Sequence, residues 1–185
     1  ETDCIACTSG KYSTTVTAAA ESYCIDCAAG QWVGTAANDD VTDCIDCVAG
    51  RYVEVTGSSD VSACIVCMAG KWSSVARVSQ ETSCIACAAG KYLETTASIA
   101  ETACIDCIAG TYGLLSASPL ETNCIDCELG RYSAVSGRTG LADCTLCALG
   151  QYQDVTGRTV CIVCVAGTYL DTQGNDAASD CIDCV

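Results

Sequence analysis

The sequence predicts a small disulfide-rich β fold, a linear tandem array of hairpin modules of about 20 residues that forms an extended rod or solenoid without helix. Three observations lead to this fold class. The chain of 185 residues holds 20 cysteines, they stand in Cys-x-x-Cys pairs at regular steps, and no stretch keeps apolar residues at a 3.6-residue period for the roughly ten residues that a helix needs.

The cysteine content indicates an oxidising compartment. Twenty cysteines, no His and one Met are typical of scaffolds whose small units are held by disulfides because they cannot bury enough core alone. We therefore expect an extracellular protein, secreted or on the cell surface.

The repeat covers the whole chain. First cysteines stand 20 residues apart from Cys4 to Cys144, then 17 apart to Cys161 and 20 apart to Cys181, and a second cysteine follows each three residues later. A Gly comes six residues after the first cysteine and an aromatic residue two after the Gly. We expect one continuous array over 1–185, with units at 4–23, 24–43, 44–63, 64–83, 84–103, 104–123, 124–143, 144–160 and 161–180 and a partial unit at 181–185.

Each part of a unit has a physical interpretation. The slot after the first cysteine is Ile in every unit except at Thr145, so we expect it to be packed. The Gly suggests a positive φ or a close backbone approach. The β-branched stretch 52–56 predicts a short strand that turns at Gly57, which makes the unit a small hairpin. A Ser or Thr two residues before most first cysteines, such as Thr42, can bond its own backbone.

The short unit 144–160 shows where three residues can be lost. It keeps the aromatic residue, the strand and the turn, and the deletion falls after Gly157. We expect the segment before the next cysteine to be an exposed, tolerant loop.

The repeated string Cys-x-x-Cys-x-Ala-Gly-x-Tyr, followed by a turn and another Cys-x-x-Cys, resembles the ephrin-receptor-like cysteine-rich repeats over the whole chain. It is also similar to the minimal one-disulfide modules of tumour necrosis factor receptor ectodomains. The resemblance implies that the second cysteine of each pair bonds the first cysteine of the following pair. The implied bonds are Cys7–Cys24, Cys27–Cys44, Cys47–Cys64, Cys67–Cys84, Cys87–Cys104, Cys107–Cys124, Cys127–Cys144, Cys147–Cys161 and Cys164–Cys181, which leave Cys4 and Cys184 for bonds to preceding and following copies.

The residues alone leave the cysteine pairing open. A bond inside one pair, such as Cys24–Cys27, closes a very small loop and removes little entropy from the unfolded chain. A bond from repeat to repeat closes a loop of about 17 residues and contributes about 3 kcal/mol in the chain-entropy model. The entropy term and the resemblance both favour the second scheme.

Two chemical interpretations of the cysteines are less well supported. The spacing of successive pairs matches that of Cys₄ zinc sites, and Cys-x-x-Cys is also a redox motif. Cysteine arrays of this kind are usually oxidised, and a redox enzyme needs one low-pKa cysteine at a helix N-terminus. With no His and no phosphate loop, we expect no enzyme, no catalytic residue, no metal site and no cofactor.

Acidic residues recur at the third slot of the cysteine motif. We expect a solvated face there, since a calcium site needs six or more clustered oxygens; a calcium ladder is the alternative. The residues concerned are Asp26, Asp46, Asp106, Asp126 and Asp183.

The aromatic side chains could bind sugars, and the hydroxyl side chains could carry them as covalent modifications. We expect the aromatic residues to pack on neighbouring apolar groups, disulfides included, in preference to forming a glycan-stacking surface. There is no Asn-x-Ser/Thr sequon, so covalent O-glycans are the expected modification, with plain solvated hydroxyls as the alternative. The candidate sites are Ser13, Thr14, Thr15, Thr17, Thr35, Thr56, Ser58, Ser73, Ser74, Thr95, Thr96, Ser116, Ser133, Ser136, Thr156 and Thr172.

Charge and hydropathy narrow the range of partners. With 23 acidic and 8 basic residues the net charge is −15, which disfavours nucleic acid, and no apolar run is long enough for a membrane span. The chain opens and closes at nearly the same phase of the repeat, so we expect a slice of a longer chain or polymer. The predicted function is structural: a stapled rod that self-associates, or joins further copies, as the core of a filament, fibril or surface appendage. The alternative is an adhesion or receptor ectodomain stalk with a ligand-binding surface.

Overall fold

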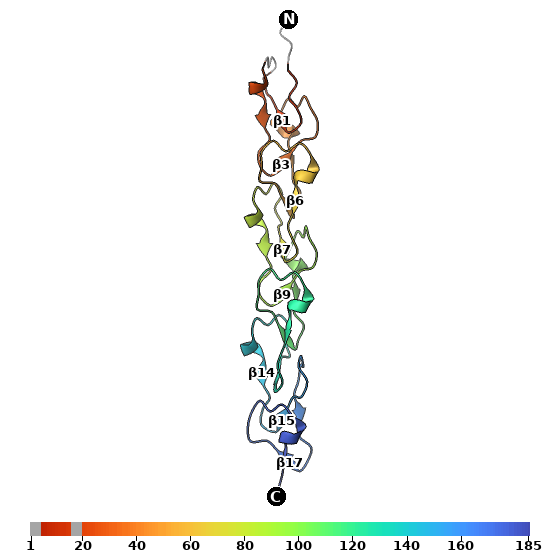
Figure 1. The fold of residues 1–185 in the computed structure, drawn as a ribbon, viewed down its shortest axis with the longest axis vertical. Helices are drawn as coiled ribbons and strands as arrows, with labels where there is room; N and C mark the ends of the chain where they lie inside the picture. The colour runs from red at the N-terminus through yellow and green to blue at the C-terminus, as the bar shows by residue number, and fades with distance from the viewer. Residues whose placement is uncertain (1–4, 16–19) are drawn as a thin grey trace. The chain divides into compact units, whose positions relative to one another are not determined.

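The computed structural model describes residues 5–15 and 20–185, which contain strands of two residues and 3₁₀-helices of three (Figure 1). The strands are β1 (Lys11–Tyr12), β2 (Ile25–Asp26), β3 (Gln31–Trp32), β4 (Ile45–Asp46), β5 (Arg51–Tyr52), β6 (Ile65–Val66), β7 (Lys71–Trp72), β8 (Ile85–Ala86), β9 (Lys91–Tyr92), β10 (Ile105–Asp106), β11 (Thr111–Tyr112), β12 (Ile125–Asp126), β13 (Arg131–Tyr132), β14 (Thr145–Leu146), β15 (Gln151–Tyr152), β16 (Ile162–Val163), β17 (Thr168–Tyr169) and β18 (Ile182–Asp183). The 3₁₀-helices are η1 (Glu21–Tyr23), η2 (Val41–Asp43), η3 (Val61–Ala63), η4 (Glu81–Ser83), η5 (Glu101–Ala103), η6 (Glu121–Asn123), η7 (Leu141–Asp143) and η8 (Ala178–Asp180).

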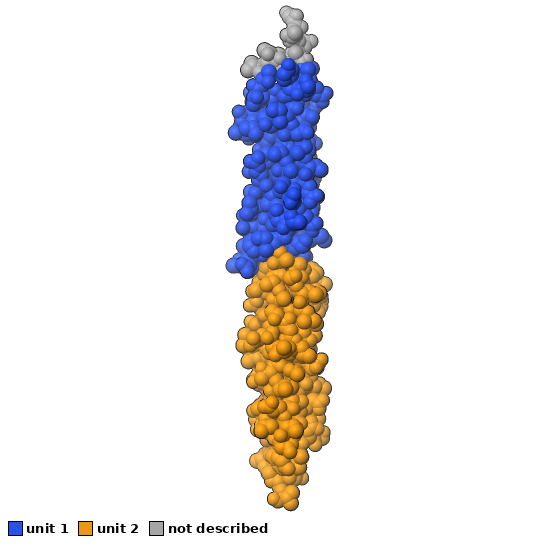
Figure 2. Space-filling view, turned by 90° about the vertical axis from the view of Figure 1, so that its left-hand side faces the viewer, with its two compact units in different colours: residues 1–85, 95–103 blue, residues 86–94, 104–185 orange. Residues whose placement is uncertain are grey.

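The chain divides into two compact units, which Figure 2 shows in blue and orange. The first holds residues 1–85 and 95–103, the second residues 86–94 and 104–185. The same local pattern recurs in both. The predicted fold class, a disulfide-rich β repeat array, is confirmed, and no α-helix occurs in the described ranges.

Each two-stranded sheet joins one repeat to the next. The strand after the Gly pairs antiparallel with the strand after the following first cysteine, so that Trp32 faces Ile45 and Gln31 faces Asp46. Trp32 also forms a parallel bridge to Ser58, farther along the same following repeat. The hairpin therefore forms between consecutive units, whereas the sequence suggested a hairpin within each unit.

Backbone hydrogen bonds between repeats end the strands early. The strand predicted over 52–56 ends at Tyr52, because the next residue, Val53, donates its N–H to the carbonyl of Val78, at 3.1 Å. In the preceding repeat, Gly30 donates its N–H to the carbonyl of Val53 at 2.9 Å and accepts from the N–H of Cys47 at 2.8 Å. Because the bonds of Val53 use only its backbone atoms, the side chain at this position of the repeat is free to vary.

The repeated Gly is required for both predicted reasons. Gly30 has φ +88°, which L-residues rarely adopt. A Cβ on Gly30 would also lie 2.6 Å from the carbonyl oxygen of Arg77, two repeats ahead. The Gly therefore turns the chain and allows a backbone segment to approach closely.

A second turn also takes a positive φ, and Gly is not always present there. The sequence predicted this turn at Gly57, where φ is +67°. Ala97 and Ala117 adopt φ +55° at the same position of their repeats. The repeat geometry imposes the left-handed conformation on these alanines, at a cost of about 1–2 kcal/mol each.

The core of each repeat consists of one disulfide and a few side chains. Cys47, Cys64 and Val53 are at most 2% exposed, and Trp32 packs against them. The residue after the aromatic, Val53 here, is buried in other repeats too, even where it is polar, as at Ser73. This core position carries no distinctive residue type, and the sequence did not reveal it.

The prediction that the isoleucine slot is packed is wrong. Ile45 is 50% exposed, and its equivalents are similarly exposed. Cys44 points inward to reach its disulfide partner, and neighbouring side chains along extended backbone point to opposite faces. The core beside each disulfide is already filled by the residue after the aromatic, so the Ile turns outward.

The 3₁₀-helices before the first cysteines were not predicted. At η3, the Asp60 carboxylate accepts a hydrogen bond from the backbone N–H of Ser62, at 2.7 Å. At η2, Asp40 does the same for Thr42, at 2.8 Å. In these two repeats an acidic cap fixes the approach to the cysteine, where the sequence suggested a Ser or Thr hydroxyl.

The short repeat lacks this helical turn. Between Gly157 and Cys161 no 3₁₀-helix forms. The Cα atoms of Cys147 and Cys161 nevertheless lie 5.8 Å apart, the same distance as between Cys127 and Cys144 in the preceding coupling. Gly157 still donates to the carbonyl of Cys127. The deletion therefore removes a dispensable turn, in agreement with the predicted tolerant segment.

Substitutions at the second turn should change the free energy of unfolding in opposite directions at Gly57 and Ala97. Gly57→Ala should lower the free energy of unfolding by about 1–3 kcal/mol, since it adds the left-handed penalty and places a Cβ 2.9 Å from Oδ1 of Asp26. Ala97→Gly should raise it by up to about 1 kcal/mol. Urea unfolding followed by tryptophan fluorescence measures both, because Trp32 bridges to Ser58 and Trp72 to Ser98. Shifts of the same sign would contradict the assignment.

Replacement by alanine should affect the free energy of unfolding much more at the buried Val53 than at the exposed Ile45. Val53→Ala should cost about 2 kcal/mol, because it removes buried methyl groups and leaves a void. Ile45→Ala should cost less than about 0.5 kcal/mol, as exposed positions usually do. Urea unfolding of the two variants provides the measurement, and equal losses would show that Ile45 belongs to the core.

Candidate functional site: the coupling between repeats

Nine disulfides link the repeats in the described chain, and they are the nine pairs that the resemblance implied. Their Cα–Cα distances are 5.6–6.0 Å, within the usual range. They are Cys7–Cys24, Cys27–Cys44, Cys47–Cys64, Cys67–Cys84, Cys87–Cys104, Cys107–Cys124, Cys127–Cys144, Cys147–Cys161 and Cys164–Cys181. Cys184 is exposed with a free thiol, and Cys4 lies outside the described residues. Their bonds to other copies stay a prediction.

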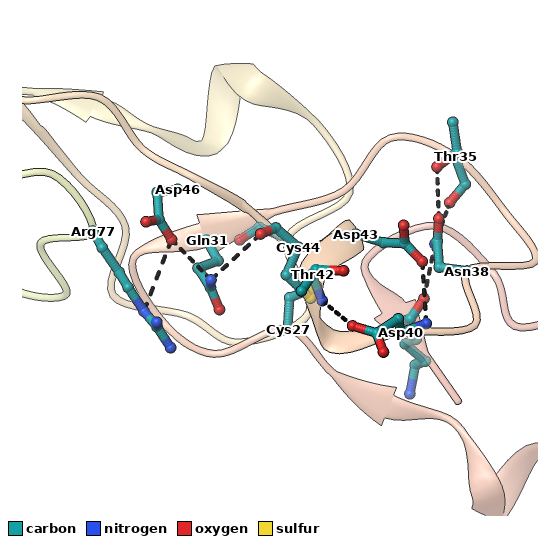
Figure 3. The surroundings of a disulfide bond; sticks show 12 residues. Cys27, Gln31, Thr35, Asn38, Asp40, Thr42, Asp43, Cys44, Asp46 and Arg77 are labelled. Atoms are coloured by element: carbon teal, nitrogen blue, oxygen red, sulfur yellow. Dashed lines mark hydrogen bonds and ion pairs between the residues drawn. A yellow bond between two sulfur atoms is a disulfide. The ribbon is translucent and has the colours of Figure 1, made fainter. Parts of the chain in front are cut away.

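The surroundings of one coupling appear in Figure 3. Cys27 is completely buried and Cys44 is 6% exposed; Val33 lies against them and Tyr12 packs from the preceding repeat. Trp32 packs in the same way on Cys47–Cys64, and Tyr112 belongs to the cluster around Cys127–Cys144. At these positions the aromatic side chains cover the coupling, as predicted.

Polar side chains join the two strands beside the coupling. Gln31 donates from Nε2 to Oδ1 of Asp46 at 2.8 Å, and Nε of Arg77 lies 3.9 Å from the same oxygen (Figure 3). The equivalent pair in the first repeats is Lys11 and Asp26, whose Nζ and Oδ1 atoms are 3.1 Å apart. The residue after the Gly therefore contacts the third residue of the next cysteine motif.

Where that third residue is apolar, the contact changes. Arg51 faces Val66, and its Nη1 donates to the carbonyl of Cys64 at 3.0 Å. Arg131 faces Leu146 and donates to Cys144 in the same way, at 2.9 Å. The residue after the Gly and its partner in the next cysteine motif stand 15 residues apart in the sequence. This pairing could be recognised only once the register between repeats was known.

The aspartates of the third slot are exposed, as expected, and they also contact other side chains of the chain. Asp26, Asp46 and Asp106 each contact a Lys or Arg of the chain, and Asp126 accepts from the hydroxyl of Thr156 at 3.1 Å. Among residues 5–15 and 20–185 no three His, Cys, Asp or Glu side chains cluster closely enough to hold a metal ion. Calcium binding stays an untested alternative.

The candidate O-glycosylation sites fall into two groups. Four serines are at most 9% exposed, so the folded chain does not present them to a transferase: Ser13, Ser58, Ser73 and Ser133. Thr17 lies outside the described residues. The exposed candidates, which stay a prediction, are Thr14, Thr15, Thr35, Thr56, Ser74, Thr95, Thr96, Ser116, Ser136, Thr156 and Thr172.

Hydrogen bonds lower the pKa values of capping carboxyls. The backbone N–H of Thr42 lowers the pKa of Asp40 below its ordinary 3.8, and that of Ser62 does so for Asp60. Thr139 lowers the pKa of Asp143 through both its N–H and its hydroxyl. Each bond favours the charged form of the carboxyl.

The fold and its couplings define a tandem cysteine-rich repeat protein whose modules are joined by disulfides. Residues 134–181 match the family model described as tyrosine-protein kinase ephrin type A/B receptor-like. The match spans the second half of repeat 124–143 and the whole of repeats 144–160 and 161–180, and it confirms the resemblance recognised from the cysteine motif. No curated protein matches the chain.

The disulfides and the match of residues 134–181 to a receptor-like family indicate an extracellular or cell-surface setting. In the part of the chain that the structure describes, no helix has the length and apolarity to cross a bilayer.

The capping carboxyls predict an acid limit to stability. Because their pKa values are lowered on folding, their contribution is complete above about pH 4 and is lost as the pH falls through the lowered values. Unfolding free energy should therefore be flat between about pH 5 and 8 and decline below about pH 4. Urea unfolding across this range, followed by tryptophan fluorescence, measures it.

A matched pair of variants tests the cause. Asp60→Asn keeps an acceptor oxygen for Ser62 but removes the titrating group, so its acid decline should be smaller than that of the wild type. Asp39→Asn changes the same charge without a cap and should retain the full decline. A decline that is identical in both variants would show that the cap at Asp60 is not responsible.

Proposed function

We propose that this chain is a tension-bearing structural element, the core of an extracellular filament, fibril or surface appendage. The observation that carries the proposal is a nearly continuous covalent path through the couplings. The second cysteine of each motif bonds the first cysteine of the next, and only two residues separate the cysteines within a motif. Force along the chain can pass through disulfides and short Cys-x-x-Cys segments.

The path limits how far the repeats can extend. A disulfide spans 5.6–6.0 Å between Cα atoms, and three peptide steps reach about 11 Å, so one repeat can lengthen to about 17 Å at most. Without the disulfide its 20 residues would reach about 70 Å. Unfolding of a repeat with its disulfide intact therefore lengthens the chain little. The segment between the two bonded cysteines, which carries the core side chains, does not lie on the covalent path that bears the force.

Self-association is the second part of the proposal. Each repeat except the one at Thr145 presents an isoleucine, and those described are 41–51% exposed, which offers apolar contacts at regular intervals. The net charge of −15 opposes the approach of a second copy. Assembly should therefore strengthen when salt or a cationic partner screens the charge.

A receptor or adhesion ectodomain stalk is the second candidate function. It is favoured by the match of residues 134–181 to a receptor-like family. In that case the repeats would act as a spacer that presents a ligand-binding surface. The two candidates differ in whether the chain assembles with itself.

Force spectroscopy on the full chain tests the tension-bearing role. We expect the oxidised chain to show no long unfolding steps, because the disulfides hold every loop closed. The double variant Cys47→Ser with Cys64→Ser opens one loop with a sequence separation of 17 and should add one step of about 55 Å. Long steps in the fully oxidised wild type would refute the covalent path.

Electron microscopy tests the assembly. Negative-stain images of native material should show filaments whose axial period is a multiple of one repeat, and more of them at higher ionic strength. Isolated single chains under all salt conditions would favour the receptor-stalk alternative.

A further inference from the structure

An apolar hollow lies beside the Cys47–Cys64 disulfide, in the first compact unit. It has a volume of about 340 Å³, and its apolar walls include Trp32, Ile45, Val48 and Val61. This volume is at the lower end of the range for ligand sites. The three aliphatic side chains are 50–64% exposed, so the hollow is accessible from outside.

The repeat that forms the wall of the hollow departs from the others. Three positions form its aliphatic wall: the slot after the first cysteine, the residue after the second cysteine and the first residue of the 3₁₀-helix. Only repeat 44–63 has large aliphatic residues at all three; the following repeat, for example, has Glu81 at the last of them. Sequence reasoning missed this departure because the positions meet only in the fold.

The polar groups of the hollow are already satisfied within the chain. Arg51 donates to the carbonyl of Cys64 at 3.0 Å. Asp46 accepts from Gln31 at 2.8 Å (Figure 3), and the N–H of Ser62 donates to a carboxylate at 2.7 Å. The hollow therefore offers chiefly apolar surface, which suits an aliphatic side chain better than a sugar or a phosphate.

Charges of both signs lie beside the hollow, and Nε of Arg77 is 3.9 Å from Oδ1 of Asp46. Asp46 lines the hollow, Asp60 immediately precedes Val61, and its one lining cation, Arg51, is turned toward a carbonyl. The chain as a whole carries −15. A second copy would bring the same negative charge, whereas a basic segment would be attracted.

We propose that this hollow docks an aliphatic side chain of a basic peptide segment from a partner protein. The side chain lies against Trp32, Ile45, Val48 and Val61, and flanking Lys or Arg residues face Asp46 and Asp60. The proposal does not depend on the tension-bearing role, because a filament core and a receptor stalk could both carry such a partner.

Tryptophan fluorescence provides the test. In the Trp72→Tyr background Trp32 is the sole tryptophan, and Tyr is the usual residue at that position of the repeat. The probe is the peptide Lys-Lys-Leu-Lys-Lys, with Lys-Lys-Ser-Lys-Lys and Glu-Glu-Leu-Glu-Glu as comparisons. We expect the first peptide to change the fluorescence of Trp32 in a saturable way, with an affinity that falls as salt is added. The other two peptides should bind at least about tenfold more weakly, which corresponds to about 1.4 kcal/mol.

Two matched variants separate docking from general attraction. Val61→Glu places in the hollow the residue that other repeats carry at this position, so the chain should still fold. It should lower the affinity for Lys-Lys-Leu-Lys-Lys at least about tenfold. Val41→Glu makes the same change one repeat earlier and should leave binding within about twofold. Equal weakening by both variants, equal binding of the serine peptide, or no saturable change would each overturn the proposal. So would a dimer of the wild type in sedimentation that Val61→Glu abolishes, because the occupant would then be a second copy.

Discussion

The disulfide that joins each repeat to the next is the interaction on which the rest of the structure depends. A segment of 20 residues cannot bury enough apolar surface to hold itself together, so the sulfur atoms form the centre of its core. Cys27 is completely buried and Cys47 nearly so. Each bond with a separation of 17 residues also contributes about 3 kcal/mol by restricting the unfolded chain. Aromatic side chains such as Trp32 then shield the bond from solvent.

Around this bond, the contacts between repeats are made mostly by the backbone. Gly30, for example, both donates to one residue of the next repeat and accepts from another. Because such contacts do not depend on side-chain identity, the buried position after the aromatic can be Val53 in one repeat and Ser73 in the next. The same independence leaves individual repeats free to acquire local features, such as the hollow beside Trp32, without loss of the array.

The surface combines exposed aliphatic side chains with strong negative charge. In most proteins a regular series of exposed isoleucines would promote uncontrolled association. Here 23 acidic residues against 8 basic ones keep like chains apart. In the proposed assembly, association should therefore depend on ionic strength or on a basic partner.

The sequence by itself determined the repeat length, the disulfide-rich β class and the turn at the repeated glycine, such as Gly30, because cysteine spacing and Gly report directly on covalent and backbone constraints. The tertiary structure alone decided that Ile45 faces outward, that Ala97 adopts a left-handed turn and that sheets form between repeats. These features depend on which segment lies opposite each residue. A two-residue strand has too few side chains to reveal its buried face by alternation, so only the register between repeats could settle them.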